Sequence, residues 1–186
     1  MDKAIEKLLN SRSVVQLGIP YNQTELATIY QSALNAPDHR GLQPWRFITI
    51  GQEQKNGLLR CYIHAQKGEG QSPDDAARKS LAAKLNCSPN IVICIFSPKK
   101  HIKVPESEQL LSMGAAIQNM IVTSCLLGGS AFWATGDLAY TQGFKDILGL
   151  EQQERIVGIL HLGKSPHKTI PKERPNVDLF FKRLEA

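Results

Sequence analysis

The chain has 186 residues, of which 42% are hydrophobic and 21% are charged. This length and composition predict one compact domain over residues 1–186 and exclude a fibrous, low-complexity or mostly disordered chain. The 22 basic and 17 acidic residues give a net charge of +5, which would suit a phosphate-bearing ligand but is also ordinary for a soluble protein.

The first ten residues mix charges with apolar positions, and the longest apolar runs are far shorter than the roughly 20 residues that cross a bilayer. We therefore expect no signal peptide and no membrane segment, and a cytoplasmic protein is the default interpretation. The cysteines lack both the spacing of zinc sites and the density of a disulfide framework. We interpret all four as reduced, buried thiols: Cys61, Cys87, Cys94 and Cys125.

Apolar periodicity and turn residues predict the elements of the first half of the chain. Asn22 and Glu25 have the spacing of a capping box, which sets the start of the second helix. Two prolines bar regular structure from the loop that follows it. In chain order we expect a helix over 2–10, a helix over 23–35, a loop over 36–44, a strand over 45–50, a helix over 52–66 and, after a flexible connection, a helix that Ser72 caps and that runs to Asn86.

The second half of the chain contains the most apolar segments. Residues 91–96 form an unbroken apolar run, which is typical of a central strand covered on both faces. Residues 105–127 are apolar nearly all round and predict a long buried helix that ends at Gly128, with inward side chains at Leu110, Met113, Ile117, Met120, Ile121 and Cys125. The remaining elements are strands over 131–134 and 155–163 and a short helix over 142–148. Because helices and strands do not alternate strictly, the order favours an α+β fold.

Many catalytic signatures are absent from the sequence. It contains no GxSxG elbow, no GxxxxGK[ST] phosphate loop, no GxGxxG motif and no HExxH or other metal-ligand spacing. Acyl transfer, P-loop chemistry, dinucleotide binding of the Rossmann type and zinc catalysis therefore lose support, and no metal is expected.

Fragments near the two ends of the chain could bind an anion, although each has a plainer interpretation. Arg12 and Ser13 offer the cation and the hydroxyl that a phosphate monoester requires, but they could simply belong to a surface loop. Lys172 and Arg174 lie in a proline-flanked, extended segment where residues two apart could face the same way. The alternative is a solvated basic tail.

Three further positions could contact a ligand. His39 follows Asp38, but adjacent side chains usually point apart, so a catalytic dyad is not expected. Trp45 begins a strand and is as consistent with a core anchor as with a ligand contact. Residues 128–137 begin with glycine and have a further glycine at Gly136, so their backbone N–H groups could approach a flat ligand, although packing alone would also explain the glycines.

In this order and spacing, the fragments resemble the nitroreductase family of FMN-dependent oxidoreductases, and particularly its small single-domain members. Ser11-Arg12-Ser13-Val14 is similar to the family's Arg-Arg/His-Ser opening, and the loop from Ala36 to Phe47 is similar to its most recognisable segment. The resemblance continues through the rest of the chain, over Ser112 to Ala116, Trp133 to Gly136, Ile156 to Gly163 and Pro171 to Arg174.

The resemblance implies a nitroreductase-like α+β fold with a central, mostly antiparallel mixed sheet flanked by helices. It also implies a homodimer in which the long buried helix lies at the interface and two FMN molecules are each held by both chains. Arg12, Ser13, Lys172 and Arg174 would bind the FMN phosphate, and His39 would contact the flavin of the opposite subunit. The cofactor-binding residues implied in this way are Ser11, Arg12, Ser13, Asn35, His39, Trp133, Ala134, Thr135, Gly136, Lys172 and Arg174.

The sequence departs from the family pattern in three ways. Ser11 replaces the first arginine, and Gly41 replaces an asparagine of the larger members, whose paired serines are here Asp38 and His39, as in the small members. Val15 lacks the positive charge that larger members place near flavin N1 and O2.

Three functions follow as hypotheses. In the first, NADH or NADPH reduces the flavin and an electron-poor acceptor, such as a nitroaromatic or a quinone, reoxidises it; no side chain is then needed as a catalytic acid or base. In the second, the protein is a flavin-binding sensor or carrier without turnover, which the uncharged Val15 favours. A nucleic-acid binder has little support because the basic residues are scattered and only 6% of residues are aromatic.

Overall fold

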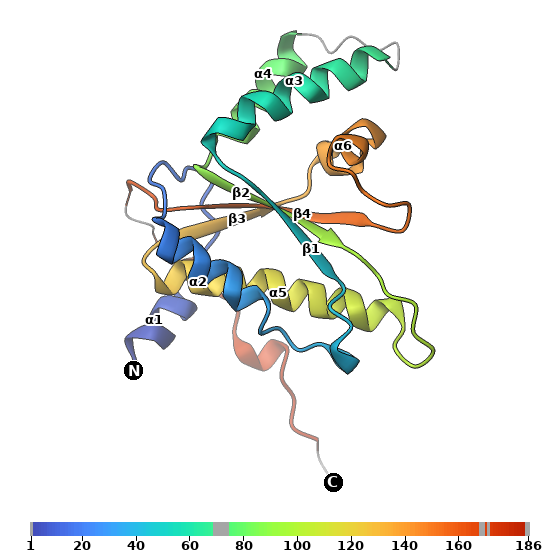
Figure 1. Cartoon of the computed structure of the whole chain (residues 1–186). Helices are drawn as coiled ribbons and strands as arrows, with labels where there is room; N and C mark the ends of the chain where they lie inside the picture. The colour runs from blue at the N-terminus through green and yellow to red at the C-terminus, as the bar shows by residue number, and fades with distance from the viewer. Residues whose placement is uncertain (1, 69–74, 168–169, 171, 185–186) are drawn as a thin grey trace.

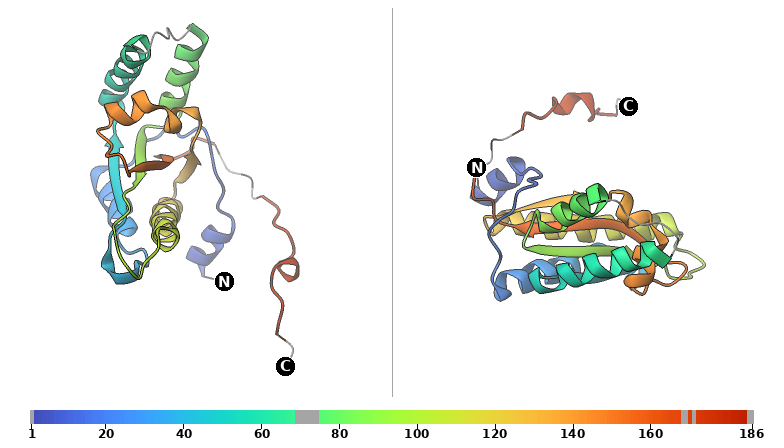
Figure 2. Two further views of the ribbon diagram at one scale, coloured as in Figure 1. Left: turned by 90° about the vertical axis from the view of Figure 1, so that its right-hand side faces the viewer. Right: turned by 90° about the horizontal axis from the view of Figure 1, so that it is seen from above.

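We describe a computed structural model of the chain, in which residues 2–68, 75–167, 170 and 172–184 are described (Figure 1). Helices pack on both faces of a sheet, and the chain after residue 172 extends away from the rest of the molecule in each view (Figures 1 and 2). The elements are α1 (Lys3–Leu9), α2 (Gln23–Ala33), η1 (His39–Gly41), β1 (Trp45–Ile50), α3 (Gln52–Gly68), α4 (Asp75–Asn86), β2 (Asn90–Phe96), α5 (Glu106–Leu126), β3 (Ser130–Ala134), η2 (Asp137–Tyr140), α6 (Gln142–Ile147), β4 (Arg155–Gly163) and η3 (Val177–Leu179).

The sheet has four strands in the order β1-β2-β4-β3, and each of its three pairings is antiparallel. The apolar run over 91–96 is the inner strand β2, as its composition predicts, and its side chains are fully buried. Strand β3 lies at one edge of the sheet. The segment before α2 runs beside that edge, where the Val14 N–H donates to Ala131 O over 3.4 Å.

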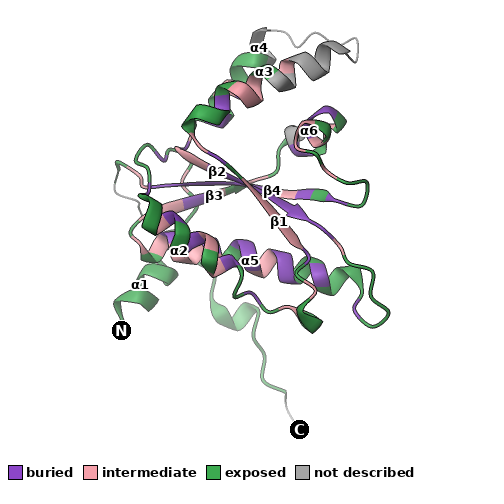
Figure 3. Cartoon of the chain, in the orientation of Figure 1, coloured by how far each residue is buried: buried purple, intermediate pink, exposed green. Residues whose placement is uncertain are grey.

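The side chains of β2 alternate between two cores, because successive residues of a strand point to opposite faces. Val92, Cys94 and Phe96 pack against α2 and α5 on one face. Ile91, Ile93 and Ile95 pack on the other face, with residues of α4 and α6. Figure 3 shows the resulting buried layer along β2, with α2 and α5 on one side and α3, α4 and α6 on the other. This two-sided coverage confirms the α+β prediction.

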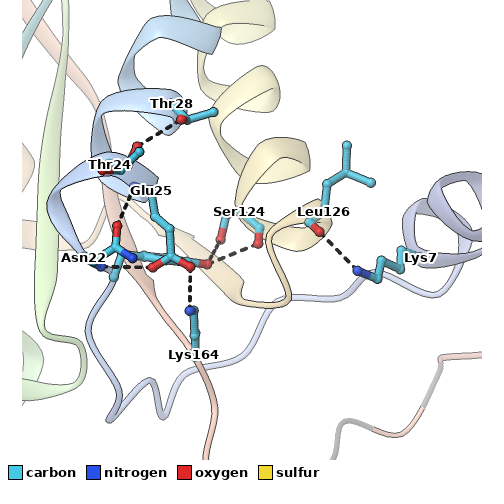
Figure 4. A network of polar contacts seen from close by, with 9 residues as sticks. Lys7, Asn22, Thr24, Glu25, Thr28, Ser124, Leu126 and Lys164 are labelled. Carbon is cyan, nitrogen blue, oxygen red and sulfur yellow. Dashed lines mark hydrogen bonds and ion pairs between the residues drawn. The ribbon is translucent and has the colours of Figure 1, made fainter.

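A polar network joins the start of α2 to the ends of α5 and β4. Asn22 and Glu25 form the predicted capping box, with bonds of 2.9 and 2.8 Å. The Glu25 carboxylate also pairs with the Lys164 ammonium at 2.7 Å (Figure 4). The Tyr21 hydroxyl lies 2.7 Å from Ser124 Oγ at the end of α5. Gly128 then ends that helix with a φ of +80°, a conformation that glycine adopts without strain.

The expectation that α5 is buried all round is wrong for the single chain. Its buried residues, Met113 and Ile117 among them, form one stripe facing the sheet. Leu110, expected inside, is 44% exposed, and Leu111 is 75% exposed. A helix packed on one side of a sheet can cover only one of its faces, so the opposite apolar face is left bare.

The cysteine expectation is correct for Cys94, which is free and buried, but not for Cys87 and Cys125, which are only partly buried. Burial raises the pKa of each of the three thiols. The Cys61 side chain and the expected Ser72 cap lie outside the described residues. Within the described ranges, no helix combines the length and the apolar character needed to cross a membrane.

Glu154 is expected to make folding stability depend on pH. Its buried carboxylate accepts hydrogen bonds of 3.0 and 2.5 Å from the Arg46 guanidinium, which lower its pKa below 4.5. A lowered folded-state pKa stabilises the fold above the unfolded value, and this contribution is lost as the pH falls through the folded pKa. E154Q should therefore cost about 1–2 kcal/mol near neutral pH, and the gap to the wild type should narrow below about pH 4.5.

Urea unfolding of both proteins from about pH 7 down to about pH 3 measures this gap. The matched control is E151Q, since the Glu151 side chain is exposed and forms no ion pair within the described part of the chain. A gap for E154Q that stays constant with pH would contradict the assignment.

Candidate functional site

A cavity of about 480 Å³ lies between α1, the end of α5, β3 and the C-terminal segment. We call it the arginine cavity, because Arg12 and Arg174 both line it. Hydroxyl groups come from Ser11, Ser13 and Ser130, and an apolar wall comes from Ile121, Ala131 and Trp133. The full lining also includes Lys7, Asn10, Gln118, Cys125, Gly128 and Gly129.

The two arginines cross-link the two ends of the chain. Arg12 Nη1 donates to Ile170 O over 3.0 Å, and Arg174 Nη2 donates to Ser11 O over 2.8 Å. A guanidinium has five N–H donors, so each arginine retains donors for a ligand after making this bond. Both side chains are exposed at the rim of the cavity. The arrangement places two permanent positive charges beside several hydroxyl groups.

A second cavity, of about 620 Å³, adjoins the first at Trp133, and we call it the tryptophan cavity. The indole Nε1 donates to Val157 O over 3.1 Å. The indole lies against Gly158, where an added Cβ would come within 2.3 Å of Nε1, so only glycine allows this packing. The lining comprises Leu110, Met113, Gly114, Ile117, Trp133, Thr135, Ala139, Tyr140, Lys145, Arg155, Ile156 and Val157.

A third cavity, of about 400 Å³, lies on the opposite face of β3, because Phe132 and Ala134 point away from the side that Ala131 and Trp133 occupy. Thr135 and Gly136 line it, and Gly136 adopts a φ of +58°. His161 forms part of the wall, with Nδ1 at 3.0 Å from Ser88 Oγ. Burial, together with the nearby Lys55 ammonium, lowers the pKa of His161 to about 4, so the imidazole is neutral at physiological pH.

The structure brings most of the expected cofactor-binding residues to β3. Ser11, Arg12, Ser13, Trp133 and Arg174 share the arginine cavity. Ala134, Thr135 and Gly136 continue from it around the end of the strand, toward the other two cavities. Residues from both ends of the chain therefore meet at one edge of the sheet.

Three expected residues lie elsewhere. Lys172 is exposed and does not line the arginine cavity, and Asn35 is exposed just after the end of α2. His39 Nδ1 lies 2.7 Å from Glu108 Oε2 at the start of α5, whereas α1 contacts the end of that helix through Lys7 and Leu126. Of the α5 residues that line the arginine cavity, Gln118 is nearest in sequence to Glu108, and ten residues or roughly 15 Å of helix separate the two. Within one chain, His39 therefore pairs at the start of α5, whereas the arginine cavity lies along the second half of that helix.

In the loop before β1, the neighbouring residues Asp38 and His39 do not form a catalytic dyad with each other. Asp38 accepts a 2.6 Å hydrogen bond from the Gln43 N–H, and His39 pairs with Glu108 instead. Trp45 is partly buried and packs against the core that contains residues of α2 and α5, which supports its role as a core anchor. Across the described ranges, no group of three or more metal-ligating side chains is placed to hold a metal ion.

Sequence reasoning missed several residues of the cavities. Gln118 is a polar residue on the same helical face as Ile121 and Cys125, so helical spacing could have indicated it. Lys145 and Arg155 carry no such signal, because they lie on α6 and β4 and only the tertiary fold brings both to the tryptophan cavity.

The arginine cavity fits a phosphate monoester attached to a flat ring system. Arginine guanidinium groups and serine hydroxyls can donate hydrogen bonds to the phosphate oxygens, and the indole of Trp133 provides a planar apolar surface beside them. The nearby loop from Ala134 to Gly136 contributes backbone rather than bulky side chains; nothing lies within 4 Å of the position that a Gly136 Cβ would take. FMN has both of the required chemical parts.

Comparison with known proteins agrees with this geometry. The model of the Nitroreductase family matches residues 20–164. The chain is 30% identical over 186 residues to YdjA of Escherichia coli (strain K12), which is provisionally named an NAD(P)H nitroreductase; the match covers 95% of this chain and 99% of YdjA.

Two solved structures share the fold across the whole chain. A nitroreductase-like family protein from Bacillus cereus aligns with a TM-score of 0.82 at 20% identity, covering 100% of this chain and 98% of that one. A nitroreductase with bound FMN from Bacteroides fragilis NCTC 9343 aligns with a TM-score of 0.69 at 20% identity, covering 100% of both chains. From the family match and the similarity to YdjA, the chain belongs to the nitroreductase family.

Proposed function

We propose that this protein is an FMN-dependent oxidoreductase that transfers hydride from NADH or NADPH to an electron-poor acceptor such as a nitroaromatic compound or a quinone. The observation that carries the proposal is the meeting of Arg12 and Arg174 at one cavity beside Trp133, in a chain of the nitroreductase family. The bound FMN reported for the Bacteroides fragilis protein and the NAD(P)H in the name of YdjA support it. FMN, when bound, would supply the hydride chemistry itself.

In this proposal, the arginine cavity holds the FMN phosphate. Arg12 and Arg174 would donate charge-assisted hydrogen bonds to its oxygens, and the Ser13 hydroxyl would add a neutral one. The bonds from Arg12 to Ile170 O and from Arg174 to Ser11 O hold both guanidinium groups in place before the ligand arrives. This pre-organisation lowers the entropy lost on binding.

The segment from Trp133 to Gly136 would border the flavin ring. Trp133 is held by its bond to Val157 O, so its position does not depend on the ligand. A backbone N–H of this segment would donate to flavin N5, the atom that gains hydride, and a donor there tunes the reduction potential. Because this chain would position and tune the cofactor, no side chain is assigned as a catalytic acid or base.

We also propose that the protein works as a homodimer through the exposed apolar face of α5. His39 pairs with Glu108, ten residues or roughly 15 Å of helix before Gln118 of the arginine cavity in its own chain, and we infer that it contacts the flavin of the partner subunit instead. The partner's His39 would then complete the site. Lys172 and Asn35 remain predicted contacts of the phosphate region.

The visible absorption spectrum of the purified protein tests the cofactor. We expect the visible absorption bands of an oxidised flavin, or their appearance after addition of FMN to the colourless protein. Colourless protein that neither binds FMN nor quenches its fluorescence would overturn the proposal.

Anaerobic addition of NADH or NADPH then separates an enzyme from a flavin-binding sensor. We expect the visible flavin band to bleach and to return when a nitroaromatic compound or a quinone is added. A bound flavin that neither nucleotide reduces would favour the sensor. Comparing initial rates with the two nucleotides would identify the preferred reductant.

A further inference from the structure

We infer that the tryptophan cavity binds the electron acceptor and selects aromatic acceptors that carry a carboxylate, with Lys145 as the group that recognises the negative charge. The inference rests on the proposed function and names the substrate class of that site.

The walls of the cavity suit a flat apolar ring. Met113 and Ile117 from α5 and Ile156 from β4 are buried and form its floor. Trp133 is 40% exposed and Tyr140 is 68% exposed, so both present aromatic surface to a ligand. A mostly apolar cavity with a few polar groups on one side is the usual form of a site for a small organic molecule.

Among the residues whose side chains the structure describes, Lys145 and Arg155 are the charged ones that line the cavity, and none of these lining residues is a carboxylate. Arg155 is already engaged, because it forms an ion pair with Glu106 and lies 5.1 Å from the centre of the Phe96 ring. Among the residues that the structure describes, no acidic side chain pairs with the Lys145 ammonium. Among these described side chains, the Lys145 ammonium is therefore one positive charge without an acidic partner next to apolar surface, where an anion gains more than it would in open water.

One positive charge and apolar walls match a monoanionic aromatic compound better than a nucleotide. The phosphates of a dinucleotide carry several negative charges, for which the two arginines of the arginine cavity are better suited than the single unpaired ammonium among the described side chains of the tryptophan cavity. Trp133 and Thr135 belong both to this cavity and to the segment assigned to the flavin ring. A ring held in the cavity would therefore lie beside the hydride donor.

Binding of the isosteric pair 4-nitrobenzoate and 4-nitrobenzamide by isothermal titration calorimetry tests the inference, on both the flavin-free and the FMN-supplemented protein. We expect the wild type to bind the carboxylate about tenfold more tightly than the amide. K145Q should abolish the preference by weakening carboxylate binding alone, and K145R should retain it. The matched control is K100Q, which removes an equal charge at an exposed residue that does not line the cavity.

Equal affinity of the wild type for the two compounds would overturn the inference, and so would a preference that K145Q retains or that K100Q removes equally. Tighter binding of adenosine 2′,5′-bisphosphate that K145Q abolishes would overturn it too, because Lys145 would then recognise the nucleotide. These titrations need no turnover. Failure of the proposed function would instead appear as protein that binds no flavin, whatever its carboxylate preference.

For the active enzyme, kcat/KM for 4-nitrobenzoate should fall about tenfold in K145Q, while kcat/KM for 4-nitrobenzamide and the FMN content stay unchanged. A parallel loss with both compounds would mean that Lys145 has a structural role and would contradict its assignment to the charge.

Discussion

Replacing Arg174 by alanine is expected to weaken the binding of FMN by about 10- to 100-fold, because each charge-assisted hydrogen bond to a phosphate contributes about 1.5–3 kcal/mol. R12A should have an effect of similar size. Quenching of FMN fluorescence during titration of the flavin-free protein measures the affinity. Both arginines line the same cavity, so the double variant should retain no specific affinity for the phosphate end of the ligand.

Riboflavin is the matched ligand for this experiment, because it has the flavin ring and the ribityl chain but no phosphate. R174A should change the affinity for riboflavin little, even though the substitution also removes the bond to Ser11 O. An equal loss for both ligands would mean that Arg174 acts by holding the C-terminal segment rather than by binding phosphate. K182A is the matched protein control; since Lys182 is exposed in the same C-terminal segment and does not line the cavity, it should leave FMN affinity unchanged.

Replacing Leu111 by glutamate is expected to convert a homodimer into monomers. Leu111 is the most exposed leucine of α5, and Leu110 and Leu126 are exposed on the same helix. An interface built on such a face is largely apolar, and an unpaired carboxylate buried in it would cost several kcal/mol. Size-exclusion chromatography with light scattering measures the mass of the particle at micromolar protein concentration.

The matched control for Leu111 is S80E, which adds the same charge at an exposed position of α4, on the opposite face of the sheet. It should leave the dimer intact. If the partner's His39 completes the flavin site, L111E should also lower FMN affinity at protein concentrations where S80E binds normally. A dimeric L111E, or a monomeric wild type, would contradict the proposed interface.

The elements of this fold follow from local signals that the sequence contains. Three such signals each act within a few residues: the capping box of Asn22 and Glu25, the apolar run of β2 and the glycine after α5. The predicted bounds of α2, β2 and α5 are therefore confirmed to within one or two residues at each end. The resemblance to the nitroreductase family depends on the order of such local segments, and it too is confirmed.

The local sequence pattern predicted the burial of α5 wrongly, because an apolar residue looks the same in the sequence whether or not its side of the helix faces the core. Leu110 and Met113 both fit the helical pattern, yet Met113 is buried against the sheet and Leu110 is exposed. Only the packing of the helix on one side of the sheet separates the two residues. The same ambiguity affected the cysteines, where burial depends on neighbours that are distant in the sequence.

By itself, the sequence determined the class of the fold, the bounds of its elements and the family, since these depend on periodicity, capping and motif order along the chain. The tertiary structure decided which residues share a site. It placed Arg12 against the backbone of residue 170 and Arg174 against that of Ser11, paired His39 with Glu108 at the start of α5, and brought Lys145 and Trp133 to one cavity. Such contacts join residues that are far apart in the sequence, and their partners are selected by the packing of the whole chain rather than by any local preference.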